Sequence, residues 1–154
     1  MQSEYWDVPD GKIAAVVTML QAFERPAPRK TPDIAAQLVA HPKPDLDWYR
    51  DLFRRVGGLD WLWFSRLGMG DTELSAILNS DDVHVYSLRH NGRDEGLLEL
   101  NFAQKGECEL GYFGVTADMV GTGAGRWRWP NPLLATGWRT WRKPWRLGDG
   151  WGRT

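Results

Sequence analysis

The stretch Glu109-Leu-Gly-Tyr-Phe-Gly-Val115, followed by Gly121-Thr-Gly-Ala-Gly-Arg126, is the part of the sequence that decides the fold class. The first segment reads as an apolar strand and the second as a glycine-rich loop. Glycines at alternate positions let the backbone turn tightly and bring its N–H groups close to an anion. A helix that begins at the loop adds its positive N-terminal end. The pattern therefore predicts a phosphate-binding loop at the end of a strand.

The elements before this loop exclude two familiar nucleotide-binding motifs. The G-x-G-x-G spacing differs from G-x-x-x-x-G-K-[ST] and from G-x-G-x-x-G, and the preceding strands form a meander rather than a βαβ unit. These strands are predicted at Val83–Arg89, Gly96–Phe102 and Glu107–Val115. Asn91-Gly92 indicates a hairpin, because both residues tolerate the positive φ of a type I′ turn, and Lys105-Gly106 makes the second turn.

Two helices and one more strand are predicted further upstream. Ile13–Leu20 is rich in Val and Ile and predicts a first strand. The proline-rich region that follows predicts a loop with a short helix at Asp33–Ala40. Helices are expected over Leu46–Val56, capped by Asp45 and ended by Gly57-Gly58, and from a cap at Asp71 through Asn79. The aromatic segment Trp61–Leu67 is interpreted as a helical turn that fills the core in preference to a ligand wall.

Length, net charge and cysteine count exclude several classes of protein. A chain of 154 residues with a net charge of −1 indicates one domain and argues against a general nucleic-acid binder. The single cysteine, Cys108, excludes a disulfide scaffold and a cysteine-based metal site, and the three histidines are scattered. Ile13–Leu20 is too short to span a membrane. We therefore expect a cytoplasmic protein without a metal, a nucleic-acid partner or a membrane partner.

The order of strand, two helices, three-strand meander and glycine loop resembles the GNAT (GCN5-related) family of acyl-CoA-dependent N-acetyltransferases, over roughly residues 8–127. The resemblance implies an α/β (α+β) fold with a mixed, mostly antiparallel sheet flanked by helices. It implies acetyl-CoA as cofactor and direct attack of a small-molecule or peptide amine on the thioester. It does not decide between a monomer and a homodimer.

The resemblance also assigns the cofactor-binding residues. In the family motif (Q/R)-x-x-G-x-(G/A), Gly123 and Gly125 occupy the glycine positions, and Val120 stands where Gln or Arg is usual. The backbone amides of Phe113, Gly114 and Val115 would bind the pantetheine arm and polarise the carbonyl. The pyrophosphate would be held by Gly121, Gly123, Ala124, Gly125 and Arg126.

For the catalytic base, the resemblance favours Glu109, with Glu99 on the adjacent strand as the second candidate. A solvated strand residue is an equally weighted interpretation of either glutamate. Strand alternation predicts Glu107, Glu109, Gly111 and Phe113 on one face, unless a bulge near Gly111 changes the parity. Many family members protonate the leaving thiolate with a tyrosine on a late helix, and no residue here matches it. Tyr112, the last tyrosine, lies on the strand.

Residues 128–154 depart from the family pattern. Pro130 and Pro132 end the expected helix, and the following Trp, Arg, Gly and Pro residues, all encoded by GC-rich codons, show no strand pattern. We hypothesise a truncated or frameshifted acetyltransferase whose last family-like residue is near 127. The alternatives are a catalytically impaired coenzyme A-binding remnant and an interaction protein with an Arg/Trp arm that binds RNA or a membrane surface. An incomplete domain predicts poor turnover, dye binding and broad unfolding.

Overall fold

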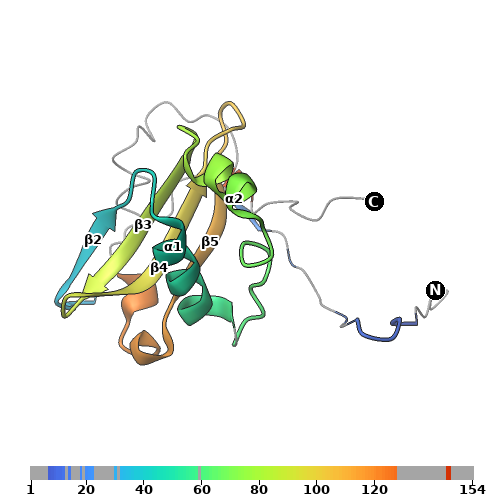
Figure 1. Cartoon of the computed structure of the whole chain (residues 1–154). Coiled ribbons are helices and arrows are strands. Elements are labelled where there is room, and N and C mark those ends of the chain that lie inside the picture. Colours follow the sequence, from blue (N-terminus) through green and yellow to red (C-terminus); the bar gives the residue numbers. More distant parts are fainter. Residues whose placement is uncertain are drawn as a thin grey trace.

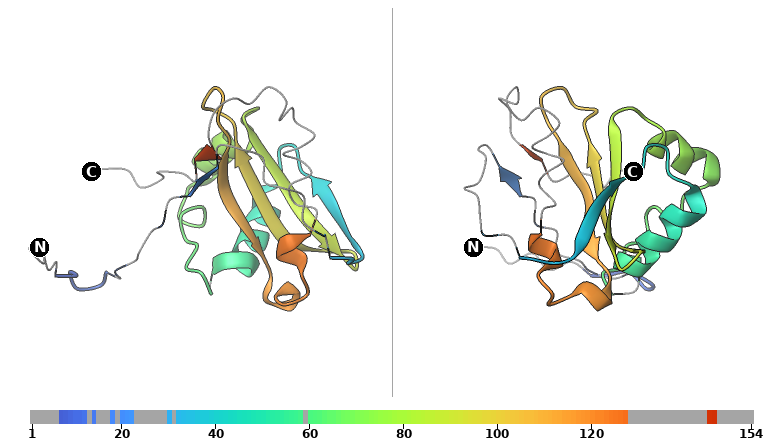
Figure 2. Two further views of the ribbon diagram at one scale, coloured as in Figure 1. Left: turned by 180° about the vertical axis from the view of Figure 1, so that it is seen from behind. Right: turned by 90° about the vertical axis from the view of Figure 1, so that its left-hand side faces the viewer.

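A four-stranded antiparallel sheet forms the centre of the fold (Figure 1). The structure is a computed structural model, and it describes residues 7–12, 14, 18, 20–22, 30, 32–58, 60–127 and 145–146. The strand order is β2 (Ala36–Ala40), β3 (Val83–His90), β4 (Arg93–Asn101) and β5 (Glu109–Val115). In the right-hand view of Figure 2, both helices lie on one side of this sheet and the turns of the glycine loop lie on the other. The expected mixed α and β class, with a mostly antiparallel sheet flanked by helices, is confirmed.

The two predicted helices are present. Helix α1 (Leu46–Phe53) begins after Asp45, whose carboxylate accepts a hydrogen bond from the Trp48 N–H at 2.9 Å, as predicted. A π-helical turn, η1 (Arg54–Gly58), continues it to the expected glycine pair. Helix α2 (Asp71–Leu78) is capped by Gly70, so the prediction of Asp71 as cap is wrong. The Asp71 carboxylate instead pairs with the Arg50 guanidinium at 2.7 Å.

The helix predicted at Asp33–Ala40 is wrong, because strand β2 occupies most of this segment. Ile34, Ala36 and Leu38 repeat every two residues and pack into one core cluster, which is the period of a strand. Residues of β2 also pair with β3 from Ala36↔His90 to Ala40↔Tyr86. Alanine has the highest helix propensity, but the preference is less than about 1 kcal/mol per residue, and sheet pairing and burial override it.

The meander is confirmed. Asn91 and Gly92 have φ values of 49° and 79° in the turn between β3 and β4, as the hairpin prediction required. Gly106, with φ of 82°, lies in the connection from β4 to β5. Each connection is short, and the strands therefore follow one another in the sheet in chain order.

A β-bulge at Gly111 interrupts the pairing of β4 with β5. Glu99 pairs with Tyr112, whereas Leu100 pairs with Leu110, so Gly111 is an extra residue in β5. The predicted alternative, a bulge near Gly111 that changes the parity, is therefore confirmed, and the parity without a bulge is wrong. Because Leu110 and Cys108 pack on the sheet face opposite the helices, Glu109 between them lies on the helix-covered face with Tyr112.

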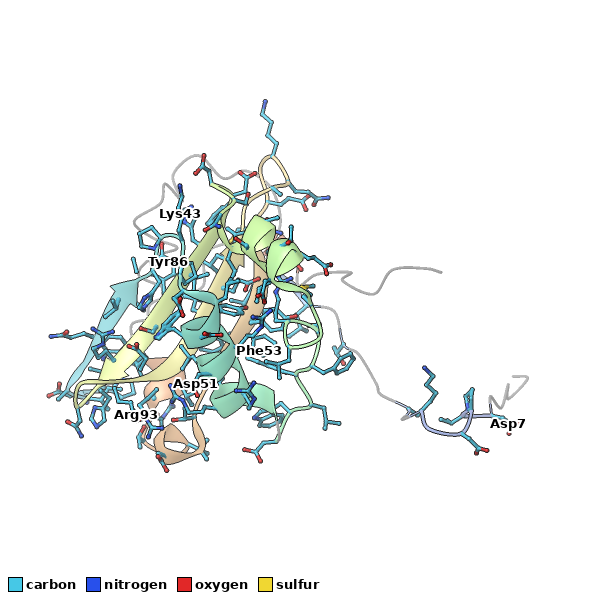
Figure 3. All side chains as sticks on the ribbon, in the orientation of Figure 1. Asp7, Lys43, Asp51, Phe53, Tyr86 and Arg93 are labelled. Atoms are coloured by element: carbon cyan, nitrogen blue, oxygen red, sulfur yellow. The ribbon has the colours of Figure 1, made fainter. Side chains whose placement is uncertain are left out.

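Two apolar clusters cover the two faces of the sheet. The first fills the space between the helices and the sheet and includes Phe53, which is labelled in Figure 3. The second, against which Tyr86 packs, covers the other face and includes Met119, Ala124 and Trp127 from the glycine loop. The loop is thus anchored to the sheet by burial of its own apolar side chains.

Several predictions fall on residues without a description. The strand predicted at Ile13–Leu20 lies mostly outside the described residues, and so does the tail beyond 127 apart from residues 145–146. Strand β1 (Gln21–Ala22) pairs antiparallel with β6 (Trp145–Arg146). In the part of the chain that the structure describes, no helix is long and apolar enough to cross a membrane.

Candidate functional site

The glycine-rich loop turns sharply at the end of β5, where the sequence predicts the phosphate site. Gly121 and Gly123 have φ values of 80° and 90°, a conformation that favours glycine. They lie between two short 3₁₀ turns, η2 (Ala117–Met119) and η3 (Ala124–Arg126). A Cβ atom on Gly121 or Gly125 would have no described atom within 4 Å, whereas one on Gly123 would lie 2.9 Å from Pro32 Cγ. The loop therefore has room on its outer side at positions 121 and 125.

Hydrogen bonds within the loop fix its shape. The Arg126 N–H donates to the Gly123 carbonyl at 2.9 Å, and the Ala124 N–H donates to Thr122 Oγ1 at 3.3 Å. Thr122 Oγ1 in turn donates to the Met119 carbonyl at 2.8 Å. Arg126 is exposed, and its backbone N–H is already bonded within the loop. Its guanidinium is therefore the group that could contact a phosphate.

The predicted pantetheine-binding segment lies beside an aromatic side chain from the loop between the helices. A Cβ atom on Gly114 would lie 2.7 Å from Val56 Cγ1 and 3.2 Å from Trp63 Cη2. A Cβ atom on Gly57 would lie 2.2 Å from the same indole ring. Trp63 therefore occupies a slot between η1 and β5 that exists because both walls are glycines.

The prediction that the aromatic segment Trp61–Leu67 fills the core is correct for Trp63 and Leu67, which both pack against the cluster on the helix side of the sheet. Trp63 packs against Phe53 and Tyr112, with ring centroids 5.3 and 5.2 Å away. Trp61 is 70% exposed, and Leu62 and Phe64 are exposed as well. Residues 65–67 form a turn, and the segment is held by the indole together with hydrogen bonds from Ser65 and Arg66 to the sheet.

Glu99 lies in a buried polar cluster, which we call the Glu99 cluster and define as Glu99, Tyr49 and Arg66. The Tyr49 hydroxyl donates to Oε2 at 2.5 Å and the Arg66 guanidinium donates to Oε1 at 2.6 Å. Glu99 is 1% exposed. Burial, with the Glu99 charge beside it, raises the pKa of Tyr49. Burial opposes the charge of Arg66, but the Glu99 carboxylate outweighs it and raises the pKa of the guanidinium.

The Glu99 cluster lies under the bulge in β5. A Cβ atom on Gly111 would lie 3.3 Å from Glu99 Oε1, so glycine lets the bulged backbone approach the carboxylate. Arg66 also lies 5.3 Å from the centroid of the Tyr112 ring, within the range of a cation–π contact. The hydroxyls of Tyr112 and Ser65 are 2.5 Å apart. The structure thus brings Glu99 together with Tyr112, while Glu109 lies further along β5 on the same sheet face.

A second polar cluster joins α1 to the sheet around Asp94. The Asp94 carboxylate accepts hydrogen bonds from Trp48 Nε1, Ser87 Oγ, and Nε and Nη2 of Arg89, at 2.8 to 3.0 Å. Burial would raise the pKa of Asp94, but these donors outweigh it and lower the pKa. His41 Nε2 lies 2.8 Å from Ser87 Oγ. Because the Ser87 proton goes to Asp94, Ser87 accepts from His41 and is not activated as a nucleophile.

Cys108 and the histidines add no reactive group to the site. Burial, and then the neighbouring Glu109 charge, raises the pKa of the Cys108 thiol to about 12. His84 contacts Tyr86 and Phe102 on the other face of the sheet. Within the described ranges, no group of three or more His, Cys, Asp or Glu side chains could hold a metal ion.

Comparison with known proteins gives a weak likeness of fold. No protein-family model matches the sequence, and no curated protein sequence is similar to it. Among solved structures, the chain is similar to the IAA acetyltransferase from Bacillus cereus at 14% identity with a TM-score of 0.42. The match covers 69% of this chain and 57% of that protein.

Proposed function

We propose that the chain is an N-acetyltransferase that transfers an acetyl group from acetyl-CoA to an amine. The observation that carries the proposal is the glycine turn at the end of β5, with left-handed Gly121 and Gly123 and room outside positions 121 and 125. Because no side chain covers the backbone at these two positions, a pyrophosphate could approach it closely. The exposed Arg126 adds a positive charge at the same place.

When bound, acetyl-CoA supplies the activated acetyl group as a thioester. The backbone amides of Phe113, Gly114 and Val115 would hold the pantetheine arm and donate to the thioester carbonyl oxygen. Trp63 and Val56 fix the Gly114 backbone from the helix side, because both lie where its Cβ would be. A rigid strand in this position keeps the carbonyl in one orientation relative to the amine.

We assign the catalytic base to Glu109 rather than to Glu99. Both Glu99 oxygens already accept hydrogen bonds from side chains of the protein, and the residue is 1% exposed, so a substrate amine has no direct access to the carboxylate. Glu109 is only half-buried and lies on the face of β5 that carries Tyr112. It is therefore better placed to accept a proton from a substrate ammonium, directly or through water.

The first test is a calorimetric titration of the full chain with coenzyme A. Gly125→Val adds a side chain on the open side of the loop and should weaken binding at least tenfold, with little effect on folding. Gly70→Ala, which also adds a Cβ in open space but at the start of α2, is the matched control. Gly123 is less suitable, because its positive φ and its contact with Pro32 would confuse loss of binding with loss of structure. Equal affinities for Gly125→Val and its control would refute the loop assignment.

The second test concerns turnover of acetyl-CoA with a panel of amines. Glu109→Gln removes the base and keeps the size of the side chain, so it should lower kcat about a hundredfold with little change in coenzyme A affinity. A chain that binds coenzyme A but shows no transfer to any amine would favour the alternative, a catalytically impaired binding module. A fully active Glu109→Gln variant would return Glu109 to the solvated-strand interpretation.

A further inference from the structure

Thr116 joins the start of the glycine loop to the sheet through both its backbone and its side chain. The Thr116 N–H donates to the Glu95 carbonyl at 2.9 Å, and the Thr116 hydroxyl donates to Glu95 Oε2 at 2.7 Å. Both residues are buried. Figure 3 labels Arg93, which lies shortly before Glu95 in β4, at the end of the sheet where the loop turns. A hydrogen bond from a hydroxyl to a carboxylate is stronger than one between neutral groups, so this contact holds the loop where it leaves β5.

The Thr116 hydroxyl makes this bond in place of the one that its position in the chain favours. Thr116 directly precedes the turn η2, where a threonine side chain usually accepts a hydrogen bond from a backbone N–H of the first turn. At η2 the side chain makes no such capping bond, and its hydroxyl is turned to Glu95 instead. The orientation of Thr116 is therefore set by the contact with β4 rather than by local preference.

A second β-bulge, in β4, orients the Glu95 carboxylate. The pairing of β3 with β4 shifts after Leu88, which makes Glu95 the extra residue in β4. Arg55, from η1 on the helix side, lies 3.6 Å from Glu95 Oε2 and donates to the Asp94 carbonyl at 2.9 Å. Arg55 is itself held by the Asp51 carboxylate of α1, at 2.8 Å. The acceptor of the Thr116 hydroxyl is thus fixed from the helix side as well as by its own strand.

Beyond Thr116, the loop continues as a connected series of hydrogen bonds. The Thr116 carbonyl accepts from the Met119 N–H at 2.9 Å, and the Met119 carbonyl accepts from the Thr122 hydroxyl at 2.8 Å. Thr122 Oγ1 in turn accepts from the Ala124 N–H at 3.3 Å. The two loop glycines with left-handed φ lie within this series. A displacement of Thr116 would therefore reach the residues that we propose as contacts of the pyrophosphate.

We propose that Thr116 and Glu95 are positioning residues for the pyrophosphate of the cofactor, an inference that rests on the proposed binding of acetyl-CoA by the glycine loop. Glu95 holds the Thr116 hydroxyl, and Thr116 sets where the loop turns relative to β5. Both side chains are buried, and they act through the loop without contacting the cofactor. The proposed base, Glu109, lies at the opposite end of β5. The hydrogen bond should therefore affect cofactor affinity and not the chemical step.

The test is a calorimetric titration of coenzyme A into the full chain and its Thr116 variants. Thr116→Val removes the hydroxyl and keeps the branched shape, so the coenzyme A Kd should rise about tenfold or more. Thr116→Ser restores the hydroxyl and should keep the Kd within about threefold of the parental value. Thr72→Val, the same substitution at an exposed position of α2, is the matched control and should change the Kd less than about twofold.

Two further measurements separate positioning of the loop from a general loss of structure. With acetyl-CoA and an accepted amine, Thr116→Val should raise the KM for acetyl-CoA and leave kcat and the KM for the amine within about twofold. In the absence of cofactor, hydrogen exchange of Thr116→Val should be faster at the loop amides of Met119 and Ala124 and unchanged in α1. Glu95→Met removes the acceptor of the same hydrogen bond and should reproduce these results, which provides a second variant if Thr116→Val does not fold.

A Thr116→Val variant with the parental Kd would overturn the assignment. So would a Thr116→Ser variant that binds as weakly as Thr116→Val, because the hydroxyl would then not be responsible. Unchanged hydrogen exchange in the loop, or a loss confined to kcat, would also contradict a positioning role. Failure of the parent chain to bind coenzyme A would instead refute the proposed function on which the inference rests. The titration of the parent therefore distinguishes the two failures.

Discussion

Removing the positive charge from the Glu99 cluster should destabilise the chain strongly. In the parent, the Glu99 carboxylate is 1% exposed and both of its oxygens accept hydrogen bonds, one of them from the Arg66 guanidinium at 2.6 Å. Arg66→Met keeps an unbranched apolar side chain in the same space but leaves a buried carboxylate without its counter-charge. The uncompensated charge, rather than the lost attraction, dominates the cost.

The magnitude follows from burial and from the number of donors lost. Removing one partner of a buried ion pair costs about 3–5 kcal/mol of unfolding free energy, and Arg66 is only 15% exposed. Tyr49→Phe removes one hydrogen bond to the same carboxylate and should cost about 1.5–3 kcal/mol. Replacing all three polar groups together, with Met at 66 and 99 and Phe at 49, should cost far less than the sum, because no charge is then left buried.

Urea denaturation of each variant, followed by circular dichroism, measures these costs. Arg93→Met is the matched control, because its guanidinium is 60% exposed and lies 3.5 Å from Glu95. Glu95 is buried but keeps Arg55 and Thr116 as partners, so losing a mostly exposed guanidinium should cost only about 0–1 kcal/mol. An Arg66→Met cost no larger than that of the control would refute the reasoning. So would a triple variant whose cost equals the sum of the single ones, since the three groups would then be independent.

Three further predictions follow from single contacts. Burial lowers the pKa of His41 in the folded chain; the Asp94 charge opposes this shift and the Arg89 charge adds to it, so the unfolded chain binds more protons below about pH 6.5. Unfolding free energy should therefore fall as pH drops through this range, and His41→Asn should flatten that slope in urea melts at several pH values. Cys108, with its pKa raised to about 12, should react with a thiol reagent at pH 8 only after denaturation, so rapid labelling of the folded chain would contradict its burial. Gly57→Ala places a Cβ inside the Trp63 ring and should cost about 1–3 kcal/mol or more, whereas Gly68→Ala, whose Cβ meets nothing closer than 3.7 Å, should cost little, as thermal melts would show.

Local sequence signals were sufficient for the helices and the meander. The turn between β3 and β4 needs two positive φ values, which few residue pairs other than Asn91-Gly92 tolerate. The hairpin was therefore predictable from these two residues. The Asp45 cap and the helical spacing of its apolar residues predicted α1 in the same way. Strand β2 was missed because its five residues pair with β3, about fifty positions later, and nothing in the segment itself reveals that partner.

The polar clusters were beyond prediction from local pattern. The Tyr49 and Glu99 side chains that bond at 2.5 Å are 50 positions apart, and Arg66 is 33 positions from Glu99. Ser87 and Asp94 come close only because β3 and β4 pair across a hairpin with its own register shift. Sequence reasoning identified Glu99 as a candidate base. The partners that hold its charge in place come from α1 and from the irregular loop between the helices.

Gly111 links the fold to the proposed chemistry. Its extra position in β5 moves Glu109 to the side of the sheet that carries Tyr112, and its missing side chain lets the bulged backbone lie beside the Glu99 carboxylate. An alanine there would place a Cβ 3.3 Å from Glu99 Oε1, so the bulge or the Arg66 pair would have to shift. A shift of the bulge would displace Glu109 and Tyr112 together, since both are oriented by the same extra residue. The orientation of the proposed base therefore depends on one backbone feature. Gly111→Ala should lower kcat by a larger factor than it raises the coenzyme A Kd, with a small change in thermal stability.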